Sequence, residues 1–475
     1  MKISLIGGFD KNLLEQRIQK VAAAGKLSRF KGNVFEVLDS CNDYEKNLNL
    51  IKRIIGMGHK SIIEHDYVVF AICDVTPIVE QTLIGNRLTS FTIKSRREVD
   101  FRNAGFYIPT FRDKDLNIHS DNEKLQKKYT SHIEFLFNTY SEFVDSNIKS
   151  EDARFILPYS FYSNIIMGLD ARELEKLTIS LLYGPLSKIS ELKELGDKFL
   201  EIIKINIPYL FDSIQNYDNT KINEDPFSYL EKISETKDVK IQTVPKLLSY
   251  TKNPDDAILI SSIMYHFQYS KEEAEKILNE NVKKDNFFKE KYMNTILRKE
   301  ENRELEQVNF TFQIPVSLCI LTHLTRHRMH SLLIPEFIPL WNFSNFIIPE
   351  SISKHQELKL KFLDAQKKNL SILEEFKTYG VANEDLVYFY LGCQMLNVIT
   401  TINARSLQWI LRLRCCNKAQ WQIRNISKQI AKEVTNVAPL LGKNLGPTCV
   451  TDFVCKEGKE SCGLINAILK NREFK

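Results

Sequence analysis

Six consecutive residues, Arg326 to Ser331, form the densest group of side chains that could do chemistry, and they read Arg-His-Arg-Met-His-Ser. Arginine guanidinium groups hold phosphate or carboxylate oxygens through paired hydrogen bonds. His327 lies between two arginines and can donate a further hydrogen bond to a phosphate. The pattern therefore predicts a site for a small anionic ligand. The alternative is a surface cationic cluster or a set of structural ion pairs.

A metal site is a second interpretation of the same segment. His323, His327 and His330 follow the i, i+4, i+7 spacing of one helical face, and histidine is a common zinc ligand. Two arginines stand beside that face, and their positive charge would repel a divalent cation. We therefore favour the anion site for these histidines.

An earlier segment carries the same pattern with different losses. Residues Gly85 to Ser90 read Gly-Asn-Arg-Leu-Thr-Ser and lack the cationic head, but they lead on to Ser95-Arg96-Arg97. The later copy keeps the head and loses this Ser-x-Arg tail, because Glu336 and Ile338 occupy the matching positions. Complementary losses suggest one working site assembled from both copies.

The likeness between the two halves extends well beyond this motif. Phe70 to Arg97 resembles Phe312 to Ile338, and Leu169 to Leu174 resembles Ile402 to Leu407. The landmarks keep their order at an offset of roughly 233–242 positions, which predicts a tandem duplication of one domain. We expect four parts: a first repeat at 1–215, a polar linker at 216–240, a second repeat at 241–440 and a cysteine-containing tail at 441–475.

The elements that must position these residues indicate an α+β fold, with antiparallel-rich sheets flanked by helices. Tyr67 to Cys73 and Val308 to Ile314 are β-branched and aromatic, so they are predicted strands, each leading into a helix that carries the Arg/His motif. Ser95 to Arg97 is expected in a loop after the first of these helices. Periodicity predicts further helices over 123–145, 354–378, 403–413 and 419–434. The most apolar stretch, Leu386 to Thr401, is predicted to be a buried helix.

Composition excludes several classes of function. The 475 residues carry a net charge of only +5, which does not suggest a broad nucleic-acid surface. The first ten residues have too short an apolar run for a signal peptide, and no stretch resembles a membrane span. Nine cysteines without a secretory signal indicate a reducing, cytoplasmic setting.

Three tail cysteines, Cys449, Cys455 and Cys462, are spaced Cys-x5-Cys-x6-Cys, and Cys416 could supply a fourth thiolate. Four thiolates are the ligand set of a structural zinc site. The spacing is looser than a paired Cys-x2-Cys signature, so unligated thiols remain the alternative. No Gly-rich nucleotide fingerprint and no nucleophile pair stands out, so any chemistry is expected to belong to a bound cofactor.

Taken together, these motifs resemble those of the flavin-dependent thymidylate synthases. That family's signature is Arg-His-Arg-x-x-Ser-x-Asn-x-x-Ser-x-Arg, with several accompanying motifs. The chain matches these motifs at Gly58 to His65, Ala153 to Pro158, Arg326 to Ser331, Asn403 to Leu407, and Arg414 ahead of Ala419 to Ile423. The resemblance covers nearly the whole chain, once in each half.

The resemblance implies a division of the nucleotide site between the halves. In the homotetrameric family, one subunit offers residues that match Ser95, Arg97 and Arg154 here. Its partner offers residues that match Arg326 and Arg414, and His323 stands at a nucleotide-binding position that is commonly Gln. By pattern alone, Arg154 could equally be a salt-bridged helix cap. The reciprocal positions are lost, at Gly85, Leu181, Glu336, Ile338 and Val387.

The flavin contacts implied by the resemblance come from both repeats. The second repeat would supply Arg326, His327, Arg328, Asn403 and Arg405, and the opposite repeat would supply His59 and Ser61. A homodimer of this chain would reproduce the family's four-domain assembly.

The implied reaction is the reductive methylation of dUMP to dTMP, with FAD as cofactor and methylenetetrahydrofolate and NADPH as co-substrates. Arg414 would stabilise the uracil ring as its N3 loses a proton. Thr92 and Leu333 replace the signature Asn, which raises the alternative of a different pyrimidine nucleotide. Two alternatives are not enzymes. One is a non-catalytic flavin- or nucleotide-binding protein, and the other is an interaction protein with a zinc-binding tail.

Overall fold

The computed structural model describes residues 1–7, 14–217, 241–338 and 343–470. The expected linker lies outside these ranges except for Asn216 and Tyr217. The chain divides into two units. The first comprises the described parts of Met1–Asp238, Phe337–Phe343 and Ile348–Gly392, and the second those of Val239–Glu336, Ser344–Ile347 and Cys393–Lys475.

Each unit contains a four-stranded antiparallel sheet, and the two sheets have the same strand order. The first sheet runs β1-β2-β4-β3, from β1 (Lys2–Gly7), β2 (Tyr67–Val75), β3 (Ser90–Ile93) and β4 (Ser163–Asp170). The second runs β5-β6-β8-β7, from β5 (Lys246–Tyr250), β6 (Asn309–Ser317), β7 (Ser331–Leu333) and β8 (Met395–Asn403). Identical topology in the two halves confirms the predicted α+β class and the tandem duplication.

The stretch Leu386 to Thr401 is not the buried helix predicted from its apolar character. It begins with a short 3-10 helix, Val387–Phe389, and continues as β8. Along β8, buried residues such as Leu396 and Val398 alternate with less buried ones such as Asn397 and Ile399. This period of two and the β-branched content favour a strand over a helix.

Helices surround both sheets. The first half contains α1 (Leu14–Leu27), α2 (Val34–Asp39), α3 (Tyr44–Gly56), α4 (Pro77–Ile84), α5 (Asn122–Asp145), α6 (Ser150–Ala153), α7 (Ala171–Tyr183), α8 (Ser190–Asn206) and α9 (Pro208–Gln215). The second contains α11 (Pro254–Phe267), α12 (Lys271–Ile277), α13 (Asn286–Arg298), α14 (Leu318–Thr325), α15 (Glu350–Ser353), α16 (Gln356–Thr378), α17 (Asn383–Leu386), α18 (Ala404–Arg414), α19 (Trp421–Val437), α20 (Pro439–Gly442), α21 (Thr448–Thr451) and α22 (Ile465–Lys470). Among the described residues, no helix has both the length and the apolar character needed to cross a bilayer.

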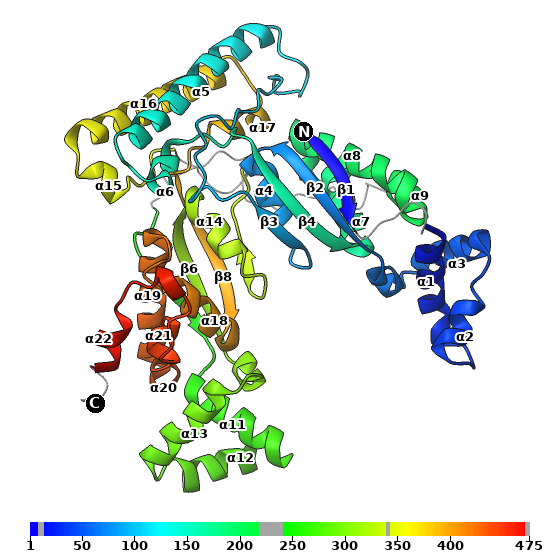
Figure 1. Cartoon of the computed structure of the whole chain (residues 1–475), viewed down its shortest axis with the longest axis vertical. Helices are drawn as coiled ribbons and strands as arrows, with labels where there is room; N and C mark the ends of the chain where they lie inside the picture. The colour runs from blue at the N-terminus through cyan, green and yellow to red at the C-terminus, as the bar shows by residue number, and fades with distance from the viewer. Residues whose placement is uncertain (8–13, 218–240, 339–342, 471–475) are drawn as a thin grey trace. The chain divides into compact units, whose positions relative to one another are not determined.

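The equivalent long helices of the two repeats, α5 and α16, pack side by side within the first unit (Figure 1). Buried His132 hydrogen-bonds Asn369 at 2.9 Å across this contact, and Lys128 forms an ion pair with Glu375. The chain after each helix also meets its counterpart, because the Tyr159 amide donates to the Tyr390 carbonyl at 2.7 Å. The second repeat thus contributes α16 to the core of the first unit.

Candidate active site

The Arg/His motif follows α14 rather than lying on it. The helix ends at Thr325, Arg326 is its C-terminal cap, and the next residues form a turn that leads into β7. His323, His327 and His330 therefore do not share a helical face. Within the described ranges, no three His, Cys, Asp or Glu side chains are gathered as they are around a metal ion.

Buried His330 fastens this turn to the sheet. Its Nε2 lies 3.2 Å from the Leu324 carbonyl oxygen and its Nδ1 lies 2.6 Å from Thr400 Oγ1. A carbonyl oxygen only accepts, so Nε2 carries the hydrogen and Nδ1 accepts from the threonine hydroxyl. The neighbouring Arg326 and Arg328 are exposed. His330 therefore positions the cationic turn.

His327 points toward the end of α18, where Arg414 Nε donates a hydrogen bond to its Nε2 at 3.0 Å. Burial, followed by the charges of Arg414, His330 and Arg326, lowers the pKa of His327 to about 3. The ring is neutral near pH 7, and because Nε2 accepts from Arg414, Nδ1 carries the hydrogen. The turn thus presents two cations and one neutral N–H donor.

The N-terminus of α18 is joined to the same turn. Asn403 Oδ1 caps the helix by accepting from the Ser406 amide at 2.8 Å, and Ser406 Oγ donates to the Met329 carbonyl at 3.2 Å. Arg405 pairs with Glu306 at 2.6 Å, and this hydrogen bond lowers the pKa of Glu306. In the second unit, Asn403 and Arg414 therefore lie on one helix that also anchors the Arg/His turn.

In the first unit, two of the three predicted nucleotide-binding residues, Arg97 and Arg154, contact Glu151. Arg97 forms an ion pair with the Glu151 carboxylate, and Arg154 Nε donates to the Glu151 carbonyl oxygen at 3.0 Å. Ser95 Oγ accepts from the Arg97 amide at 3.3 Å. Arg154 is only 4% exposed, whereas Arg97 is part-exposed. The Glu151 carboxylate is therefore the ion-pair partner of Arg97 in this cluster.

The loop that carries Ser95 and Arg97 follows strand β3, not a helix as expected. Arg96 points inward from it and pairs with buried Glu80 at 2.8 Å, with its guanidinium over the Phe161 ring. This buried pair holds the loop so that Arg97 can turn outward. Sequence reasoning missed the positioning role of Arg96, because two adjacent arginines give no signal of which one is buried.

The remaining predicted flavin residues of the first half, His59 and Ser61, are exposed at the start of the 3-10 helix Lys60–His65. Glu64 in that helix pairs with Arg172 of α7. The second repeat forms the matching pair between Glu306 and Arg405. The duplication therefore conserves this pair of contacts as well as the strand order.

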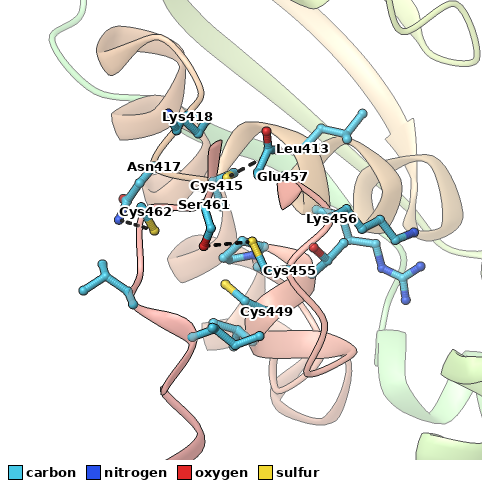
Figure 2. A pocket seen from close by; sticks show the side chains of 18 of the residues that line it. Leu413, Cys415, Asn417, Lys418, Cys449, Cys455, Lys456, Glu457, Ser461 and Cys462 are labelled. Atoms are coloured by element: carbon cyan, nitrogen blue, oxygen red, sulfur yellow. Dashed lines mark hydrogen bonds between the residues drawn. The ribbon is translucent and has the colours of Figure 1, made fainter. Parts of the chain in front are cut away.

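The cysteines predicted as metal ligands line one pocket of about 370 Å³ (Figure 2). Cys416 follows α18, and Cys449, Cys455 and Cys462 come from the tail. Burial, followed by the neighbouring cysteines, raises the pKa of Cys449. Cys415 also lines the pocket, and burial raises its pKa to about 12.

This fold and these motifs define a flavoenzyme of the methyltransferase class. The chain belongs to the family described as thymidylate synthase complementing protein (Thy1), which matches residues 12–209 and again 246–440. Two separate matches in one chain agree with the duplication read from the sequence. The likeness to the flavin-dependent thymidylate synthases predicted from the motifs is therefore confirmed.

Two similar proteins are named flavin-dependent thymidylate synthase. The flavin-dependent thymidylate synthase of Clostridium tetani is 34% identical over 237 residues, which are 46% of this chain and 92% of the relative. That of Pyrococcus furiosus is 31% identical over 222 residues, covering 44% and 88%. A solved UMP/dUMP methylase, PolB from Streptomyces cacaoi bound with 5-Br dUMP, matches with a TM-score of 0.39 and 20% identity over 46% of this chain and 96% of its own.

Proposed function

We propose that this chain catalyses the reductive methylation of dUMP to dTMP, with FAD, methylenetetrahydrofolate and NADPH, at sites that draw on both repeats. One observation carries the proposal: each repeat keeps the part of the motif set that the other has lost. Ser95, Arg97 and Arg154 persist in the first repeat, and Arg326 and Arg414 persist in the second. Random decay would have removed residues from both of these retained sets.

The groups around the Arg/His turn fit a flavin dinucleotide. Exposed Arg326 and Arg328 offer guanidinium groups suited to a diphosphate. Neutral His327 offers an N–H donor suited to a ring edge, with Asn403 and Arg405 on the adjoining helix, and the resemblance adds His59 and Ser61 from a first repeat. When bound, the flavin supplies the redox and one-carbon transfer chemistry, for which no protein nucleophile is needed.

The dUMP phosphate would exchange for a carboxylate in the first-repeat cluster. Arg97 pairs with Glu151, and a dianionic phosphate is a stronger partner than one carboxylate. Arg154 lies against the same residue, and Arg326 and His323 from a second repeat would complete the grip. We expect Glu151 to swing aside when the nucleotide binds.

Arg414 would act on the uracil ring. His327 accepts from its Nε and thereby orients the guanidinium. As uracil N3 loses its proton, the developing negative charge would be stabilised by this fixed cation. His327 remains neutral beside it, because burial and then the charge of Arg414 lower its pKa.

Two chains would reproduce the four-domain assembly of the family as a homodimer, with two complete sites and two incomplete ones. This assembly is a proposal from the resemblance and is tested by the mass of the purified protein in solution. A monomeric protein with full activity would require each site to form within one chain.

The decisive experiment is the visible spectrum of the purified protein, followed by tritium release from [5-³H]dUMP with NADPH and methylenetetrahydrofolate. Bound flavin with tritium release is expected. Bound flavin without release would favour the alternative that the substrate is a different pyrimidine nucleotide. The loss of the signature Asn, replaced by Thr92 and Leu333, supports that alternative. The same outcome with every pyrimidine nucleotide tried would indicate a non-catalytic binding protein.

A further inference from the structure

The pocket at the end of α18 brings together thiols from two distant parts of the chain. Cys416 lies two residues beyond Arg414, whereas Cys449, Cys455 and Cys462 belong to the tail. Five of the nine cysteines of the chain thus line a single pocket of about 370 Å³, these four and the buried Cys415. Figure 2 shows the side chains of the three tail cysteines around it.

The tail buries few of its side chains. Of the residues between Cys449 and Cys462, only Thr451 is buried, and the segment forms only the four-residue α21 and a three-residue 3-10 helix. A short segment without an apolar core usually depends on a cross-link, either a disulfide or a metal. The thiols supply the means for that cross-link.

The hydrogen bonds of these thiols are weak. Cys455 Sγ lies 3.4 Å from Ser461 Oγ, Asn417 Nδ2 lies 3.8 Å from Cys462 Sγ, and Cys416 Sγ lies 4.0 Å from Glu457. Thiols are poor hydrogen-bonding groups, so these contacts do not explain why four cysteines gather here. They are also easily exchanged for bonds to a metal ion.

Lysine side chains line the same pocket, at Lys418, Lys428 and Lys456. Four thiolates around one divalent ion carry a net charge of −2, and lysines can neutralise it in a partly apolar setting. Lys418 also pairs with Glu460 of the tail at 3.1 Å, on the same side as Cys462 and Asn417. The lysines would therefore offset part of the negative charge of four thiolates around a metal ion.

We propose that Cys416, Cys449, Cys455 and Cys462 bind one structural zinc ion. The four thiols must turn inward to reach Zn–S distances of about 2.3 Å, since the described side chains are not yet gathered at that spacing. Binding releases one proton from each thiol and involves no change of oxidation state. The ion joins the tail to the end of α18.

The test uses the full-length protein purified without chelator, with metal measured by mass spectrometry. One zinc per chain is expected, falling well below one in Cys416→Ser and in Cys462→Ser. Cys73→Ser is the matched control, because Cys73 lies on β2 in the first unit and does not line the pocket, and the variant should keep its zinc. Replacing zinc by Co²⁺ should produce the thiolate charge-transfer bands of a tetrahedral site.

Two results would overturn the proposal. One is wild-type protein without zinc that gives no thiolate bands with Co²⁺. The other is a disulfide between two of the four cysteines, detected by mass spectrometry before and after reduction. Neither readout depends on flavin binding or on turnover, so a failure here is separate from a failure of the proposed reaction.

Discussion

Arg414 Nε donates a hydrogen bond to Nε2 of His327 at 3.0 Å, which joins the last turn of α18 to the turn after α14. The arginine has two effects on its partner. It fixes the ring hydrogen on Nδ1, and its charge helps to hold the ring neutral. The same bond fixes one edge of the guanidinium, so the Arg414 guanidinium and the His327 imidazole are positioned by each other.

Replacing Arg414 with Ala should therefore change two observables together. The rate constant kcat should fall by about 100-fold or more, because a fixed cation at a developing negative charge is removed. The pKa of His327 should rise from about 3 toward 6.5, because one of the charges that depress it is lost. NMR titration of the His327 ring measures the second effect. Arg412→Ala is the control. Arg412 lies on the same helix α18 and pairs with Asp452 of the tail, so its loss should change neither kcat nor the pKa of His327.

Buried Glu191 should make stability fall as the pH rises. Burial raises its pKa to about 7, although Thr76 donates to it from both its amide and its hydroxyl. In the unfolded chain the group ionises near 4.5, so between about pH 4.5 and 7 the folded state binds more protons than the unfolded state. The free energy of unfolding is therefore highest below pH 4.5, and it should fall by up to ~3 kcal/mol as the pH rises through 7.

The second repeat offers the matching substitution, because Gln422 occupies the place of Glu191 and accepts from Ser317 at 2.6 Å. Glu191→Gln should keep the contacts with Thr76 and flatten the decline of Tm between pH 5 and 7. Thermal unfolding of the two proteins across this range measures the difference. An unchanged pH dependence in the variant would show that Glu191 is already ionised in the folded protein.

The duplication and the strands that carry the sheets were predictable, because periodicity and repeated landmarks are local signals. Two predictions of helices were wrong. The chain from 386 to 401 is apolar enough for a helix but is β-branched and alternating, and the Arg/His motif was extended into a helix that ends at Thr325. The alternation of buried and less buried residues decides the strand in the first case. In the second, the apolar run ends with the helix at Thr325 and the polar motif follows it.

Contacts made by tertiary folding could not be predicted. The sequence does not show that Glu151 receives both Arg97 and Arg154, or that His330 faces Thr400 instead of a ligand. The ion pairs Glu64–Arg172 and Glu306–Arg405 could have been found, since both partners recur in each repeat. A recurring pair of opposite charges at equivalent positions was the available signal.

His330→Ala should destabilise the protein without removing a ligand contact. It leaves the Leu324 carbonyl and the Thr400 hydroxyl without their imidazole partner in a buried place, at a cost of about 1–3 kcal/mol. Denaturant unfolding measures this loss. Met329→Ala is the neighbouring control, because Met329 is 79% exposed and its change should stay within about 0.5 kcal/mol. Equal stability of the two variants would contradict the anchoring role.

The proposed division of the nucleotide site between the repeats predicts unequal effects at equivalent positions. Arg97→Ala should weaken kcat/KM for dUMP by roughly 30- to 1,000-fold, or about 2–4 kcal/mol, because a charged hydrogen bond to the phosphate is lost. Ile338→Ala, at the matching position of the second repeat, should retain activity within a few-fold. Comparable losses in both variants would mean that both classes of site work. Steady-state kinetics with a nucleotide series measures the difference.

Mixing Arg97→Ala chains with Arg414→Ala chains decides where a working site is built. If a site joins residues of two chains, each mixed dimer contains one site with both arginines and one with neither. Random pairing makes half of the dimers mixed, so activity should return to about a quarter of the wild-type value. If each site forms within one chain, every site in the mixture lacks one arginine and no activity returns. Differently tagged chains, purified as verified mixed dimers, should then show half of the wild-type activity or none.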